Sequence, residues 1–170
     1  MKRILKHKVL LWVCCLLTAA SCSEVECPLD SVVVMTCRIY DAESDKLIAL
    51  QDTLTISPVG KDTVLLNQAF GVNEFVLPLK MAVEADTFLL KFSNEWDMYV
   101  TDTLIVQHTN QPHFESVDCP TSIFHKIKSV VWSKRENSTY PLIIDNVSIT
   151  RELVDYNNVE NLKITLRNRF

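Results

Sequence analysis

Residues 88–92, Phe-Leu-Leu-Lys-Phe, carry the pattern that decides the fold. Their bulky apolar side chains recur at every second position, at 88, 90 and 92. A period of two predicts a β-strand with one face in a core and the other face near water. Residues 162–166, Leu-Lys-Ile-Thr-Leu, repeat this alternation near the end of the chain.

Similar short runs recur between these two segments and before them. They are Val32–Tyr40, Leu54–Ile56, Val64–Leu66, Phe75–Leu79, Tyr99–Val106 and Leu142–Ile149. Residues typical of turns separate the runs, as in 57–62, 71–73, 110–112 and 157–158. We therefore expect an all-β fold: a single antiparallel β-sandwich or open barrel, Ig-like or related.

One segment is ambiguous. Ile123, Ile127, Val130 and Val131 are spaced as on one face of a helix. Ile127–Trp132 is also rich in β-branched residues, which favour strands. We expect a strand here, after a helical turn.

The first 21 residues have the features of a targeting segment. Residues 1–8 carry four basic side chains and no acidic one, and residues 9–20 are apolar. This apolar run is shorter than the roughly 20 residues that a transmembrane helix needs. Cleavage after residue 21 would remove four positive charges and change the formal net charge from −4 to −8.

Residues 17–22, Leu-Thr-Ala-Ala-Ser-Cys, resemble the bacterial lipobox. Small residues fit the peptidase pocket there, and the thiol of the cysteine, here Cys22, is the group that is acylated. The alternative is an ordinary signal peptide with Cys22 as a spare thiol. We expect a signal peptide over residues 1–21 and one domain over residues 22–170, tethered to a membrane through Cys22.

Three further cysteines would remain in the mature chain: Cys27, Cys37 and Cys119. Cys37 shares the apolar phase of its run with Val33 and Ile39, so it should point into the core as a free thiol. Cys27 and Cys119 lie outside the runs, and each is followed by a proline. In an oxidising envelope compartment we expect a Cys27–Cys119 disulfide.

Candidate metal ligands are few and poorly spaced. His108, His113, Cys119 and His125 lie within 18 residues, but no pair has the close spacing that holds a tetrahedral ion. His108 and His113 flank a predicted turn at Pro112. We expect no metal site and no cofactor.

Catalytic motifs are also missing from the sequence. There is no Gly-x-Ser-x-Gly motif, and two glycines in the whole chain do not make a phosphate-binding loop. The acidic pairs Glu43/Asp45 and Asp97/Asp102 occupy predicted turns and strand starts, where carboxylates are usually solvated. We expect a protein that is not an enzyme and, given its acidic charge, has no nucleic-acid partner.

Aromatic side chains in polar surroundings are the remaining candidates for binding. Trp96, Tyr99, Trp132 and Tyr140 are candidates for a platform on which sugars stack. A lone Trp beside a strand more often packs at the edge of the core.

Five landmarks resemble those of one protein family: Cys27, Arg38–Asp41, a strand start at Asp62–Val64, a turn at Leu77–Leu79, and Cys119. The chain is similar over its mature length to small Bacteroidetes lipoproteins of a domain family of unknown function. The resemblance implies an envelope location and a fold, but no activity.

An Asp-Thr-hydrophobic motif occurs at 52–54, 62–64, 86–88 and 102–104. A structural explanation is that Asp ends a turn and Thr opens a strand. The motif also resembles the acceptor for protein O-glycosylation in Bacteroidetes. Thr53, Thr63 and Thr103 fit it best, and Ser31 and Thr87 fit it less well.

Together these observations predict a non-enzymatic lipoprotein of the cell envelope that acts by protein contact at the membrane. The alternative is a surface glycan-binding module. Ser23 is not an inner-membrane retention residue, which favours the outer membrane. Ser23–Glu26 weakly resembles the acidic tag that exports Bacteroidetes lipoproteins to the cell surface, so a periplasmic and a surface location both stay open.

Overall fold

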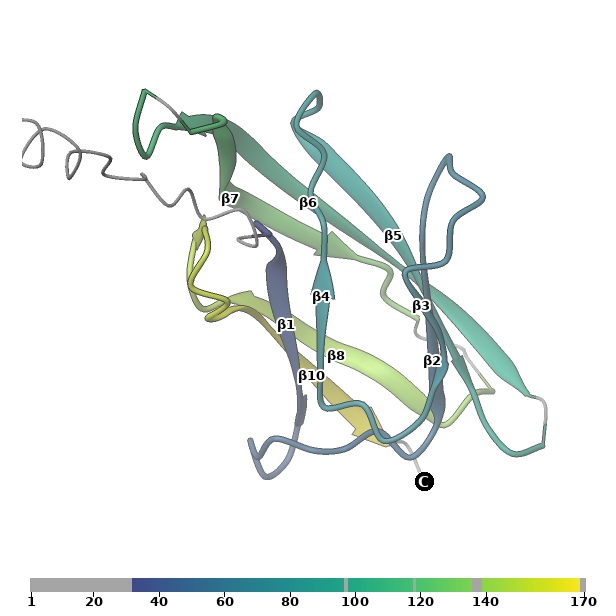
Figure 1. The fold of residues 1–170 in the computed structure, drawn as a ribbon. Coiled ribbons are helices and arrows are strands. Elements are labelled where there is room, and N and C mark those ends of the chain that lie inside the picture. Colours follow the sequence, from purple (N-terminus) through teal and green to yellow (C-terminus); the bar gives the residue numbers. More distant parts are fainter. Residues whose placement is uncertain (1–31, 97, 118, 136–138, 169–170) are drawn as a thin grey trace, which may run out of the picture.

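The computed structural model describes residues 32–96, 98–117, 119–135 and 139–168. It has two β-sheets that face each other, and the larger sheet is curled (Figure 1). The predicted all-β class is confirmed. No helix among the described residues has the length and apolar character needed to cross a membrane.

The smaller sheet has the strand order β4-β1-β10-β8. Its strands are β1 (Met35–Asp41), β4 (Glu74–Leu77), β8 (Leu142–Ile149) and β10 (Glu160–Asn168). The larger sheet has the order β3-β2-β5-β6-β7-β9. Its strands are β2 (Thr53–Pro58), β3 (Leu66–Ala69), β5 (Ala85–Ser93), β6 (Tyr99–His113), β7 (Ser122–Trp132) and β9 (Leu153–Val154).

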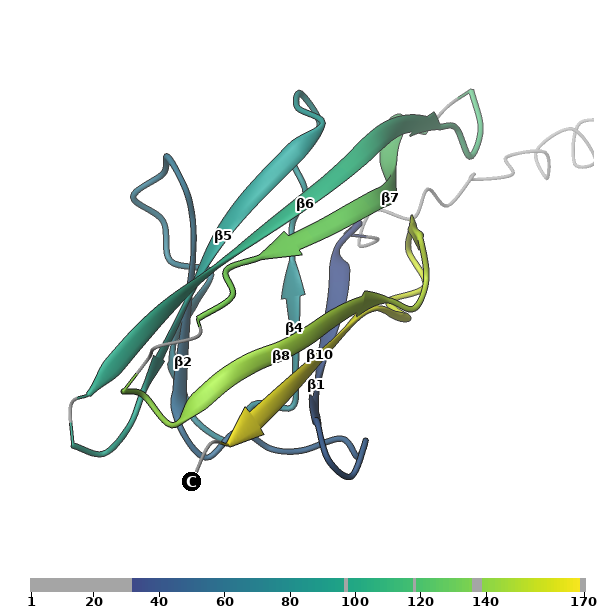
Figure 2. The same cartoon turned by 180° about the vertical axis from the view of Figure 1, so that it is seen from behind.

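One pair of strands departs from the antiparallel expectation. The first and last strands, β1 and β10, lie side by side and run parallel, while the other pairs are antiparallel. Figure 2 shows them in the middle of the smaller sheet. Parallel neighbours need a long connection between them, and here that connection consists of all the other strands.

The core fills the space between the two sheets. Phe88, Leu90 and Phe92 of β5 are buried, as the alternation predicts, and so are Leu162 and Ile164 of β10. Cys37 of β1 is buried and free, as its strand phase predicts. Burial raises the pKa of this thiol, which keeps it protonated.

The loops gather at two opposite ends of the sandwich. Met35 pairs with Leu77 and Gln107 pairs with Ala85, so the start of β1, the β4–β5 loop and the β6–β7 loop lie at one end. We call this the N-proximal end. The β5–β6 connection and the chain that follows β3 lie at the other end, which we call the distal end (Figure 1).

The helical turn expected around residues 123–127 is wrong, because β7 is a strand from Ser122 onward. His108 pairs with Ile127 and Gln107 pairs with Ser129, so Lys128 is an extra residue in β7. Such a bulge shifts the inward phase by one residue. The apolar positions on its two sides therefore imitate helical spacing.

Two predicted boundaries are also wrong. Residues 110–112 are not a turn but the end of β6, paired with β7. β5 pairs with β6 only as far as Gln107, so the missing N–H of Pro112 lies beyond the end of the β5 ladder. Residues 62–64 do not start a strand either: they lie in the β2–β3 loop, and β3 begins at Leu66.

Candidate functional site

A buried polar network connects the N-proximal halves of β5, β6 and β7. An Oδ2 atom of Asp86 lies 3.1 Å from Nε2 of His108, and both side chains are almost inaccessible. The rings of His108 and His125 meet edge to face with their centroids 5.0 Å apart. Nδ1 of His125 lies 2.7 Å from Oδ1 of Asn110. The strand pairing of β5, β6 and β7 therefore brings together four residues that sequence spacing kept apart.

This network holds the β4–β5 loop in place. Asp86 accepts a hydrogen bond from the backbone N–H of Lys80 at 2.8 Å. The side-chain amide of Asn110 donates to the carbonyl oxygens of Met81 and Val83 at 2.8 and 2.9 Å. Because that amide donates at both contacts, Oδ1 of Asn110 accepts, and Nδ1 of His125 carries the proton.

The electrostatics keep His125 uncharged at neutral pH. Burial, and secondly the nearby ring of His108, lower the pKa of His125 to about 4, although Asp86 acts in the opposite direction. Nδ1 of His108 is buried without a hydrogen-bond partner among the described residues. Among the described residues, the two rings form hydrogen bonds with Asp86 and Asn110 and not with a hydroxyl or a thiol. The network therefore holds the β4–β5 loop in place.

A groove of about 550 Å³ lies beside this loop. One wall is residues 78–82, and the other is formed by residues of the β2–β3 hairpin, including Lys61 and Leu65. Phe88 and the buried Asp86 also line it, and most of the lining side chains are apolar. Open apolar hollows with a few polar groups are common ligand sites.

The Asp-Thr-hydrophobic motif at 52–54 follows the expected pattern, because Thr53 opens β2, but the motifs at 86–88 and 102–104 do not. Asp86 and Asp102 are buried inside strands, and they do not open them. The expectation that Asp102 is solvated is therefore wrong. Asp102 pairs with Arg135 at 2.5 Å and accepts a hydrogen bond from Ser133 at 2.9 Å. Asp52, which directly precedes β2, accepts a hydrogen bond from the hydroxyl of Tyr140.

In the motifs at 52–54, 86–88 and 102–104, Asp and the hydrophobic residue share the inward phase, and Thr takes the outward phase. Thr53, Thr87 and Thr103 are half-buried on the outer side of the larger sheet, whereas Thr63 is exposed in the β2–β3 loop. The hydroxyl of Thr53 donates to the carbonyl of Ser93 at 3.2 Å. Ser31 lies outside the described residues.

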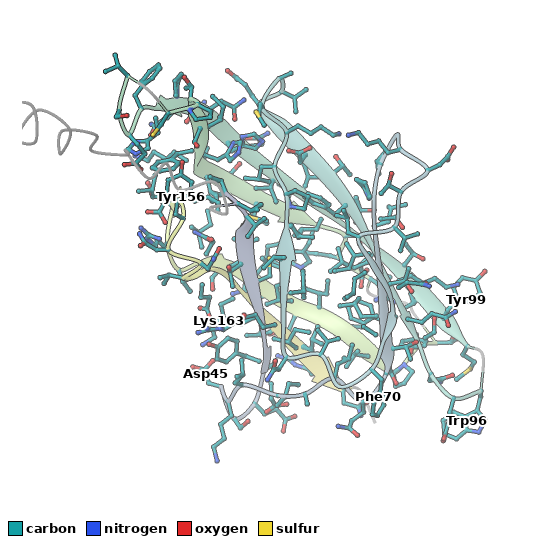
Figure 3. The ribbon with its side chains drawn as sticks, in the orientation of Figure 1. Asp45, Phe70, Trp96, Tyr99, Tyr156 and Lys163 are labelled. Carbon is teal, nitrogen blue, oxygen red and sulfur yellow. The ribbon has the colours of Figure 1, made fainter. Side chains whose placement is uncertain are left out.

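The other acidic pair behaves more as expected. Glu43 and Asp45 are exposed, and Asp45 forms an ion pair with Lys163 (Figure 3). Asp97 lies outside the described residues.

The four candidate aromatic residues separate into two groups. Trp96 and Tyr99 are exposed by 73% and 63% at the distal end, where Figure 3 labels them. Nζ of Lys91 lies 4.3 Å from the centre of the Tyr99 ring. Tyr140 is buried and Trp132 is half-buried, so neither is part of an exposed platform.

The candidate metal ligands do not converge. His113 stacks on Phe124 and lies 2.9 Å from Glu115, away from the buried pair of His108 and His125. Among the described residues, no group of three or more His, Cys, Asp or Glu side chains is placed to hold a metal ion.

Cys119 lies in the β6–β7 loop at the N-proximal end, where Ser116 donates a hydrogen bond to its sulfur at 3.4 Å. The predicted lipidation site Cys22 and the predicted disulfide partner Cys27 both lie outside the described residues. Acylation and the disulfide therefore stay predictions.

Residues 53–166 match the model of a family of unknown function, DUF6452. The chain belongs to this family. No curated protein matches the chain, and no solved structure matches it either.

The DUF6452 match is narrower than the resemblance over the mature chain that the sequence predicts. It begins at the first residue of β2 and ends within β10. It includes the groove, the network around Asp86 and Cys119, and it leaves out β1 and Cys27. The matched region thus contains both the N-proximal loops and the exposed aromatic residues of the distal end.

Proposed function

We propose that the chain is a non-enzymatic lipoprotein of the bacterial cell envelope that acts by contact with another envelope protein. Acylation of Cys22 would hold it in the outer membrane. The support for the anchor is the basic and then apolar leader, followed by small residues directly before Cys22. Several acyl chains on one residue give durable anchoring, because each buried methylene contributes about 0.8 kcal/mol.

The observation that carries the protein-contact part is the exposed apolar surface of the distal end. Its large apolar side chains include Phe70, Trp96, Met98 and Tyr99. Aromatic residues and Met are enriched at the centres of protein interfaces. Apolar residues exposed singly are normal, whereas several at one end of a domain mark an interaction site. Figure 3 shows Phe70 and Trp96 at the same end of the molecule.

Photocrosslinking in intact cells tests this proposal. A benzophenone amino acid at position 96 should give an adduct with one envelope protein. The same amino acid at Val131, which is exposed on the outer face of β7, is the matched control and should give none. Equal labelling at both positions, or no protein adduct from position 96, would contradict the proposal.

A surface glycan-binding function is the second candidate, and Trp96 and Tyr99 are the observation that favours it. Exposed aromatic rings offer faces on which sugars stack. The two functions respond differently to substitution. Trp96→Ala should abolish both, but Met98→Ala should weaken only a protein interface, because a thioether offers no stacking face for a sugar.

The Bacteroidetes origin and the side of the outer membrane belong to the same proposal. The landmark residues of the sequence support the origin, and Ser23–Glu26 support export to the surface. Protease treatment of whole cells separates the two locations, since a periplasm-facing domain would be fully protected.

A further inference from the structure

We infer that the β4–β5 and β6–β7 loops rest in the interfacial layer of the membrane that holds the anchor. The inference rests on the proposed acylation of Cys22. The N-proximal end would then face the lipid, and the distal end would face away from it.

The first observation is the apolar character of these two loops. Met81 and Phe114 are exposed by 70% and 67%, and Val83 and Val117 are exposed as well. These side chains lie on two loops of the same end, and burial in the interfacial layer would remove their apolar surface from water, which is favourable.

The second observation is where the chain to Cys22 enters the domain. The described residues begin at Val32, three residues before β1, at the N-proximal end. Nine residues, 23–31, join Cys22 to Val32, so there are ten Cα-to-Cα steps and even a fully extended tether spans about 33–36 Å. β6 has 15 residues, and at about 3.4 Å per residue it extends for roughly 50 Å between the two ends. The tether is therefore shorter than the domain, and the N-proximal end is the one within reach of the lipid.

The third observation is that the β4–β5 loop is held in a fixed conformation. Asn110 binds the carbonyl oxygens of Met81 and Val83, and Asp86 binds the N–H of Lys80. A loop that is already ordered loses little conformational entropy on contact with a surface. Its apolar side chains are therefore presented before any contact is made.

The charges around these loops indicate the kind of lipid surface. Lys128 and Glu84 line one hollow together with Val83, and Glu115 follows Phe114. Positively and negatively charged side chains are both present, so this face has no strong preference for anionic head groups. A zwitterionic phospholipid surface fits these groups best.

Quenching by brominated lipids tests the inference. The acylated protein is reconstituted into vesicles of phosphatidylcholine and phosphatidylethanolamine that carry bromine on their acyl chains. Tryptophan is introduced as Met81→Trp and, as the matched control at the distal end, as Leu47→Trp. Both variants are made in a background in which Trp96 and Trp132 are replaced by Phe, so that the introduced residue is the one tryptophan of the mature chain. Leu47 is also an exposed apolar loop residue.

We expect the tryptophan at position 81 to lose about half of its fluorescence or more, because interfacial side chains lie roughly 5–10 Å into the acyl boundary. The tryptophan at position 47 should lose none. Protein that floats with the vesicles but shows no quenching at position 81, or equal quenching at both positions, would overturn the inference and leave the anchor intact. Protein that does not float with the vesicles would overturn the anchor and the inference together.

Discussion

Met35, the first residue of β1, pairs with Leu77, the last residue of β4. This pairing places the β4–β5 loop beside the point where the N-terminal segment enters the domain. The loop forms one wall of the groove and carries the exposed Met81. One strand register thus brings together the tether, the groove and an apolar loop.

The buried carboxylate that holds this loop should contribute strongly to stability. Asp86→Asn removes the charge that faces His108 and Lys80. We expect the free energy of unfolding, measured with urea, to fall by about 1–3 kcal/mol. Asp62→Asn is the matched control, since it alters the same motif in an exposed loop, and it should change stability by less than about 0.5 kcal/mol. Equal effects would show that Asp86 does not support the loop.

Stability should fall in mild acid because of His125. The pKa of this ring is lowered from 6.5 to about 4 in the folded protein. The unfolded chain therefore binds more protons than the folded one between these values, and stability is fully present above about pH 6.5 and is lost as the pH falls toward 4. His125→Gln should lose less stability than the unsubstituted protein between pH 7 and pH 5 in parallel urea titrations. Identical pH dependence would contradict a buried, neutral His125.

Much of the fold could be predicted from alternation, because one strand face in the core gives a direct signal in the sequence. The prediction failed where the ladder is irregular. The extra residue Lys128 shifts the phase of β7, and the resulting spacing resembles a helix. Pro112 indicated a turn, yet it is tolerated where β6 has no β5 neighbour.

The candidate site was harder to predict, because its residues come together only through strand pairing. Asp86 and His108 are 22 residues apart, and Asp102 and Arg135 are 33 apart. An Asp next to a Thr indicates a turn when the residue that compensates its charge lies so far away in the sequence. The alternation itself held the missing signal, since Asp86 shares the inward phase of Phe88.

The position of each cysteine relative to the strands should decide which thiols form a disulfide. We predict that Cys27 pairs with Cys119 in the native protein and that Cys37, which is buried, stays reduced. Such a bridge would add roughly 4–5 kcal/mol in the chain-entropy model. Peptide mapping without reduction identifies the pair, and a recovered Cys27–Cys37 or Cys37–Cys119 peptide would contradict it.

The outward-facing threonines are the proposed sites of O-glycosylation. The intact mass of protein from its native host should exceed that of the bare lipidated chain. Thr63→Ala should remove one increment of that excess, because Thr63 is exposed. Thr53 and Thr103, which are half-buried in strands, should be modified to a lesser extent. A mass equal to that of the bare chain would exclude the modification.

Replacement of Cys22 by Ala tests whether this residue holds the domain at a membrane. Cells producing the Cys22→Ala variant are lysed, their membranes are washed with high salt, and the protein is followed in both fractions. We predict that the variant is released into the soluble fraction or accumulates as an uncleaved precursor. A processed Cys22→Ala protein that still stays with the washed membranes would contradict the lipid anchor.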